Sequence, residues 1–186
     1  MYEYFASTLP SFAFGAPPPM SAEELRAAAE GNLKAADLAA LDALLSGAPS
    51  DHPFVAAWRD RDTQLRNAVA RVRASRLQRN AAGAANSADA SRWLRPHGGW
   101  SAGVESGVAA AFQEPDALRR HRALARLRWD QATELAGLDP FSSAAVLAYA
   151  VRLVLAADLA KADADAGLER LRRTADPSTP STSSPQ

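Results

Sequence analysis

Residues that could carry catalysis or bind a metal are few and scattered in this sequence of 186 residues. The three histidines, His52, His97 and His121, fall in different segments, and none has the spacing of a metal site. Cysteine is absent, which excludes disulfides, thiolate metal sites and cysteine nucleophiles. The sequence also lacks a phosphate-binding glycine loop and a GxSxG nucleophile motif. We therefore expect no enzyme activity, no cofactor, no metal and no small-molecule substrate.

The most distinctive charged residues lie in one segment, from Phe54 to about Arg79, which we predict to be a helix. Apolar residues at helical spacing predict its buried stripe, with Asn67 beside it: Trp58, Leu65, Val69, Val72 and Leu77. Only Asp60 and Asp62 oppose the arginines that cover the rest: Arg59, Arg61, Arg66, Arg71, Arg73, Arg76 and Arg79. This Arg-rich helix is the best candidate for a binding element.

Three interpretations of the Arg-rich helix stay open. Arg59, Arg66 and Arg73 are spaced seven apart, so they lie roughly on one side and are tentative partner-binding residues. The helix could be a solvated face whose long side chains cover apolar neighbours, or it could bind an acidic protein or a phosphate backbone. It could also pair internally with the acidic stretch Ser21–Asp51. Aromatic residues are not interleaved with the arginines, which favours a protein partner over nucleic acid.

A long loop, Asn80–Gly103, follows the Arg-rich helix and contains two further candidate partner-binding residues. It is rich in Ala, Gly, Asn and Ser, and loops of this length are often functional. Trp93 and Trp100 enclose its distinctive stretch. They could anchor an interface or fold back on the core.

The longest apolar run is predicted to form the central helix, within Asp139–Arg173. Ser142 or Ser143 suits its N-cap. The run is shorter than the roughly 20 apolar residues that span a bilayer, so we expect a buried helix without membrane insertion. Arg152 is its only charge before Asp158. We expect this arginine to pair with backbone carbonyls or with one of the nearby acids: Asp130, Glu134 and Asp158.

The composition predicts an all-α protein, a single irregular helical bundle. About a quarter of the residues are alanine, the best helix former, and isoleucine is absent. A capping box at Ser21 and Glu24 begins one helix. Further helices are predicted at three places: Leu33–Leu45, Val104–Phe112 and Ala117–Gly137. The bundle should occupy residues 1–173, including the loop at 80–103.

The two ends of the chain differ from the bundle. The aromatic opening, Tyr2–Gly15, is predicted to pack on the core as a short extended segment, with a short helix as the alternative. Residues 174–186 contain Ser, Thr and Pro without an apolar anchor, which predicts a disordered tail. The opening lacks a basic region followed by an apolar one, so we expect no signal peptide. The formal net charge of zero gives no global indication of a nucleic-acid or anionic-lipid partner.

Several short segments occur in an ordered series along the chain: Tyr2–Pro10, Phe14-Gly15, Pro17-Pro18, Ser21–Glu24, Leu65-Arg66-Asn67, Leu127-Arg128-Trp129, Asp139-Pro140-Phe141, Val146–Leu153 and Ala164–Gly167. Together, and in this order, they resemble a small bacterial family that is encoded with the components of V-type ATP synthases. This family has been treated as a counterpart of the ring-capping component, known as C or d, of V/A-type rotary ATPases.

The resemblance implies a non-catalytic helical subunit that couples the central stalk to the membrane rotor ring. Because the chain is much shorter than the usual ring-capping component, it would be a reduced version or an assembly factor. Its partners would be stalk and rotor subunits, and it would be cytoplasmic, peripheral at the inner face of the cell membrane. The alternative is a helical adaptor that uses its Arg-rich helix on an acidic partner unrelated to the ATPase.

Overall fold

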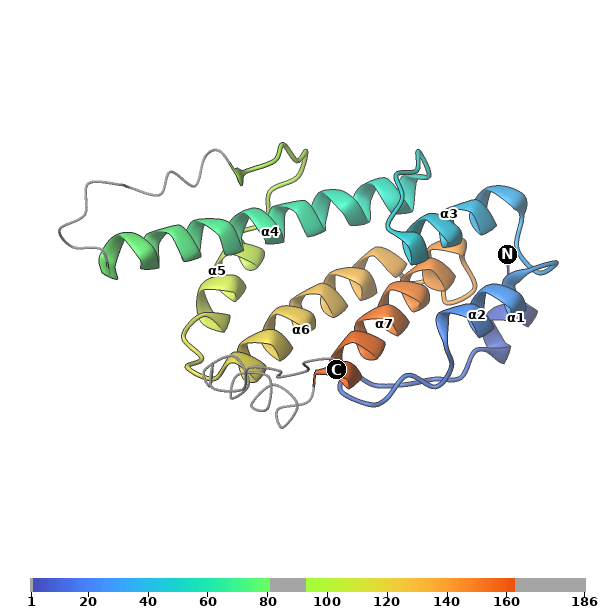
Figure 1. The fold of residues 1–186 in the computed structure, drawn as a ribbon. Helices are drawn as coiled ribbons and strands as arrows, with labels where there is room; N and C mark the ends of the chain where they lie inside the picture. Colours follow the sequence, from blue (N-terminus) through green and yellow to red (C-terminus); the bar gives the residue numbers. More distant parts are fainter. Residues whose placement is uncertain (1, 81–92, 163–186) are drawn as a thin grey trace, which may run out of the picture.

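The computed structural model describes residues 2–80 and 93–162, and over these ranges the chain forms seven α-helices and no strand. The predicted all-α class is therefore confirmed for this part of the chain. Figure 1 shows α6 and α7 side by side, α4 lying across them, and α1 to α3 at one end. The helices are α1 (Glu3–Thr8), α2 (Ala22–Ala29), α3 (Ala35–Ser46), α4 (Pro53–Asn80), α5 (Ala102–Ala111), α6 (Ala117–Ala136) and α7 (Ser143–Lys161).

Local signals in the sequence set several of the helix ends. The predicted capping box of α2 is present: Ser21 Oγ accepts the Glu24 N–H at 3.1 Å, and the Glu24 carboxylate accepts the Ser21 N–H at 2.7 Å. Ser142, one of the two predicted candidates, caps α7 by accepting the Ala145 N–H at 3.1 Å. Gly47 ends α3 with a φ of 73°, a left-handed conformation that glycine adopts without steric cost.

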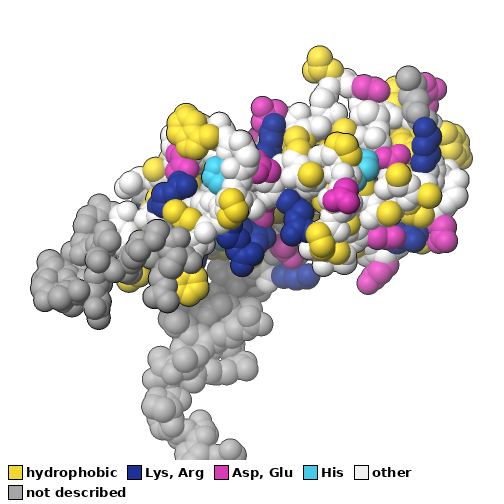
Figure 2. Space-filling view, turned by 90° about the horizontal axis from the view of Figure 1, so that it is seen from above, with side chains coloured by type: hydrophobic (Ala, Val, Ile, Leu, Met, Phe, Trp, Pro, Cys, Tyr) yellow, Lys and Arg dark blue, Asp and Glu magenta, His cyan; other side chains and the backbone are white. Residues whose placement is uncertain are grey.

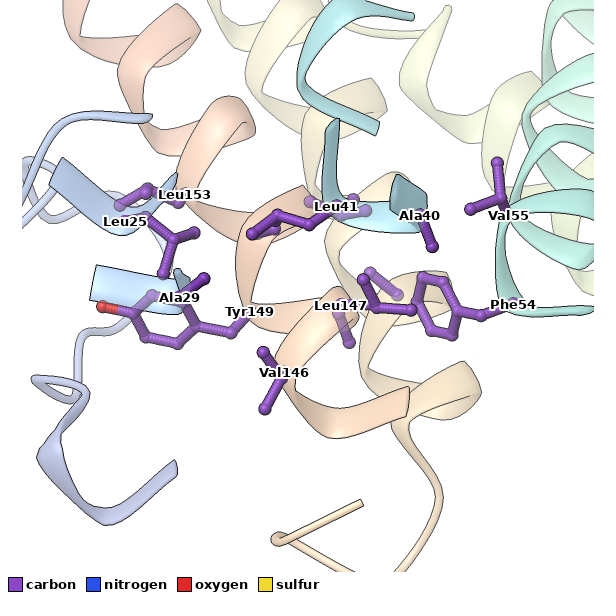
Figure 3. Packing of buried hydrophobic residues seen from close by; sticks show 14 of the residues in the cluster. Leu25, Ala29, Ala40, Leu41, Phe54, Val55, Val146, Leu147, Tyr149 and Leu153 are labelled. Atoms are coloured by element: carbon purple, nitrogen blue, oxygen red, sulfur yellow. The ribbon is translucent and has the colours of Figure 1, made fainter. Parts of the chain in front are cut away.

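The main hydrophobic cluster surrounds α7. Residues Val146 to Val151 are all buried, as are Leu153 and Ala156. Figure 3 shows Leu25, Leu41 and Phe54, from three different helices, close to the side chains of α7. A helix without a polar face needs such neighbours on most sides.

The prediction that α7 is too short to span a membrane is wrong when it is judged by length and composition alone. Its 19 residues are long and apolar enough to cross a bilayer by those two criteria. Packing gives the stronger reason for its apolar surface, because α2, α3 and α6 all contact it. The predicted continuation to Arg173 and the tail at 174–186 lie outside the described residues.

The predicted extended segment at the N-terminus begins instead as a helix. Phe5 of α1 is buried in the main cluster, which fixes one face of this short helix. Residues 9–20 then form an irregular connection that passes beside the lower end of α7 and returns to α2 (Figure 1). Phe12 packs edge-on against Trp129 and Tyr149, with ring centroids 5.3 and 5.2 Å apart. The aromatic opening therefore packs on the core, as predicted.

A second hydrophobic cluster lies between α4, α5 and α6. Its buried members include Leu65, Val108 and Phe112, and Val69 and Val72 pack against it. The predicted stripe of α4 is wrong at Leu77, which is 60% exposed. The last turns of α4 extend past α5 in Figure 1, beyond the reach of this cluster. One long helix thus contributes to both clusters.

Truncating Leu147 tests the assignment of α7 as the centre of the fold. Leu147→Ala should lower the free energy of unfolding by about 2–5 kcal/mol, because the side chain is fully buried and leaves a cavity. Chemical denaturation measures the change. Leu138→Ala is the matched control, since Leu138 is fully exposed and its loss should cost under about 0.5 kcal/mol. Equal, small losses in both variants would contradict the arrangement.

Candidate protein-binding surface

The segment 93–100 is held along α4 through its backbone. The Asn67 side-chain amide donates to the Arg95 carbonyl at 2.7 Å and accepts the Arg95 N–H at 3.0 Å. The Asp60 carboxylate accepts the N–H groups of both Gly98 and Gly99. A Cβ at Gly99 would lie 3.1 Å from the Asp60 carboxylate, so glycine permits this close approach. The segment is therefore attached at two points.

The structure bears on one of the two sequence interpretations of Trp93 and Trp100, and the interface role stays a prediction. The segment does fold back on the body of the protein, as one of them predicted. Its tryptophan side chains nevertheless stay outside, since Trp93 and Trp100 are each 71% exposed. The hydrogen bonds from Asn67 and Asp60 go to the backbone of the segment, and both indoles are largely exposed to solvent.

A basic depression of about 460 Å³ lies between α3, α4 and this segment. Three arginines line it, Arg59, Arg66 and Arg95, together with the indoles of Trp58 and Trp93. Figure 2 views the α4 side of the molecule, where Lys and Arg side chains are spaced across the surface with acidic and hydrophobic ones between them. We call this hollow the basic depression.

Asp62 is the only carboxylate in the lining of the basic depression, and it is shared. Its two oxygens accept from Arg66 at 2.7 Å and from Arg128 of α6 at 2.8 Å. Arg59 and Arg95 have no acid within ion-pair distance in the described part of the chain. The depression therefore presents more positive than negative charge to a partner.

The structure brings together three of the five predicted partner-binding residues. Arg59, Arg66 and Trp93 line the basic depression. Arg73 is exposed one heptad further along α4, outside the lining. Trp100 lines a different hollow, of about 630 Å³, with Arg61 and Glu134. The predicted set thus divides between two places on the surface.

Arg95 and Asn67 are residues of this surface that were not predicted to bind a partner. Arg95 lay within the distinctive stretch of the loop, but nothing indicated that the stretch returns to α4. Asn67 was noted as a neighbour of the apolar stripe and within the Leu65-Arg66-Asn67 segment of the family resemblance. A polar residue beside a buried stripe is a signal for a backbone anchor, because a buried amide needs partners.

Internal pairing of the Arg-rich helix with the acidic stretch Ser21–Asp51 is absent among the described ion pairs. The arginines of α4 pair elsewhere: Arg61 with Glu134, Arg66 with Asp62, and Arg71 with Glu105. In the acidic stretch, Asp42 pairs with Arg26 and Asp37 with His52. That third interpretation is therefore not supported.

The predicted ion pair of Arg152 is wrong for the described residues. The three acids proposed for it pair with other bases: Asp130 with Arg126, Glu134 with Arg61, and Asp158 with Lys161. Arg152 instead places its guanidinium over the Trp129 ring, 5.6 Å from the centroid. Arg152 lines another hollow, separate from the basic depression and from the one that Trp100 lines.

No group of three or more metal-ligating side chains occurs in residues 2–80 and 93–162. Comparison of the chain with models of known protein families, with characterised proteins and with solved structures finds no match. The similarity to the V-type ATP synthase operon family thus stays a prediction from the segments that carry it.

Replacing Asn67 tests whether it anchors the 93–100 segment. Asn67→Leu keeps the volume but leaves the Arg95 N–H and carbonyl without their partner, which should cost about 1–3 kcal/mol of stability. Hydrogen exchange at the Arg95 amide should also speed up. Ser75→Ala, on the exposed side of α4, is a control that should leave this exchange unchanged. An unchanged Arg95 amide in Asn67→Leu would show that the anchor lies elsewhere.

Proposed function

We propose that this chain is a non-catalytic helical adaptor that docks an acidic surface of a partner protein on the basic depression. The observation that carries this proposal is the clustering of Arg59, Arg66 and Arg95 beside exposed Trp93, with Asp62 as the only opposing carboxylate. Arginine and tryptophan are the side chains that most often dominate protein interfaces. Charge complementarity would speed docking and fix its orientation.

We further propose that the partner is a central-stalk or rotor subunit of a V-type ATP synthase. Support comes from the family resemblance, because three of the residues that carry it meet beside this surface. Arg66 and Arg128 share the Asp62 carboxylate, and Asn67 anchors the neighbouring segment. An adaptor with this partner would sit at the cytoplasmic face of the membrane complex and would couple or assemble stalk and rotor.

A protein partner suits this surface better than nucleic acid. Three arginines, Arg59, Arg66 and Arg95, are gathered in one hollow, and the chain has no net charge. Trp93 does add one exposed aromatic side chain that the helix sequence alone lacked. Binding of single-stranded DNA therefore belongs in the test as a competing outcome.

Charge reversal in the basic depression tests the docking proposal. Arg59→Glu combined with Arg66→Glu should weaken co-purification with V-type ATP synthase stalk or rotor subunits by about tenfold or more, most strongly at low salt. Circular dichroism should show unchanged helix content, because both side chains are exposed and Asp62 keeps Arg128. Arg119→Glu with Arg122→Glu, on exposed positions of α6, is the matched control of equal charge change.

The outcomes separate the candidate partners. Loss of binding in the depression variant alone supports the proposal. Equal binding by both variants would remove this surface from the interface. Selective binding of an acidic protein outside the ATP synthase would replace the proposed partner with the general adaptor. Salt-dependent binding of single-stranded DNA, lost in the same variant, would contradict a protein partner.

A further inference from the structure

A cavity of about 350 Å³ lies between the N-terminal segment, α6 and α7. Along α7 its lining consists of Ala145, Val146, Tyr149 and Arg152, which recur on one face. These positions extend about 10 Å along the helix at 1.5 Å per residue. The cavity is therefore elongated, with the turn at 137–140 towards one end and Arg152 towards the other.

Apolar groups make up most of the remaining wall. Leu9 and Phe12 come from the N-terminal segment, Ala136 from the end of α6, and Leu138 from the turn that follows it. The polar groups near the middle are already bonded within the protein. Tyr149 Oη donates to the Pro10 carbonyl at 3.0 Å, and Thr133 Oγ1 donates to the Trp129 carbonyl at 2.9 Å.

Arg152 is the exception, because its guanidinium lacks a hydrogen bond or an acid among the described residues. Its Nε is buried without a partner. Partial burial lowers the pKa of Arg152, while the phenol of Tyr149 acts in the opposite direction. Arginine nevertheless keeps its charge in proteins. The Trp129 ring covers the guanidinium at 5.6 Å and supplies only part of the lost solvation.

Asp139 is the one carboxylate in the lining, and it belongs to the opposite end. It lies in the turn before α7 and accepts the Phe141 N–H at 2.9 Å. Arg152 is nine residues into α7, about 13 Å along the helix. The two ends of the cavity thus differ in charge, and the cation at one of them has no acid partner among the described residues.

We propose that this cavity binds a small organic acid with an apolar body, and that the acid places its carboxylate on Arg152. Guanidinium donors match a carboxylate in geometry and charge. The apolar lining between Arg152 and the turn suits an acyl or aryl group, and ligand sites of this size combine apolar walls with a few polar groups. This site is separate from the basic depression and does not depend on the proposed docking function.

Octanoate is the probe for this proposal, measured by titration calorimetry on the full chain. Arg152→Met keeps an unbranched apolar side chain and removes the charge, so it should weaken octanoate binding by at least about tenfold. Arg122→Met, at an exposed position of α6, makes the same change away from the cavity and should bind like the parent. Octanol, which has the same chain without the carboxylate, should bind the parent and Arg152→Met alike.

Thermal unfolding without ligand gives the second measurement. Removing a partly buried cation that has no acid partner in residues 2–80 and 93–162 should raise the melting temperature of Arg152→Met by about 2 °C or more. A lower melting temperature would overturn the proposal, since Arg152 would then be a structural residue. It would also be overturned by the absence of saturable octanoate binding at millimolar concentration, or by equal octanoate binding in Arg152→Met. Octanoate binding should persist in the Arg59→Glu, Arg66→Glu variant, which keeps this test independent of docking.

Discussion

The fold depends on covering α7, whose apolar side chains point to nearly every side. No single neighbour can bury such a helix, so the chain surrounds it with α2, α3, α6 and the N-terminal segment. The short α1 and the irregular stretch after it would have too little core of their own. They are ordered because Phe5 and Phe12 fill space beside α7 and Trp129. Burial of one helix thereby fixes the position of elements distant in the sequence.

The length of α4 links this core to the rest of the molecule. Phe54 and Val55 near its start belong to the main cluster, while Leu65 and Ala68 belong to the second one. Apolar contacts occupy the inner face of α4 from Phe54 to Ala68. The arginines of α4 must therefore lie at the edges of that face or on the outer side of the helix. Some are neutralised locally by acids of α4, α5 and α6. Those at the edge next to the 93–100 segment form the basic depression.

Sequence patterns predicted the features that depend on neighbouring residues, such as helix caps and buried stripes. They did not predict the features that depend on contacts between distant parts of the chain. The capping box at Ser21 and the helical spacing of Leu65 and Val69 depend on positions within a few turns, so they were predictable. Arg59 and Arg66 were marked by their spacing, but the approach of Trp93 depends on Asn67 binding a backbone far along the chain. Arg152 was expected to pair with backbone carbonyls or with Asp130, Glu134 or Asp158, because a charge inside an apolar helix needs a partner. Its real surroundings come from the packing of Trp129 and Phe12, which no local pattern encodes.

The 93–100 segment is held through its main chain, in the way that a peptide is held in a binding groove. Asn67 and Asp60 recognise main-chain N–H and carbonyl groups rather than particular side chains, and Gly99 is constrained by its close approach to Asp60. If the proposed docking occurs, the residues that hold the segment are distinct from the exposed ones that would meet a partner. The exposed positions could then change while Asn67, Asp60 and the helical bundle beneath stay the same.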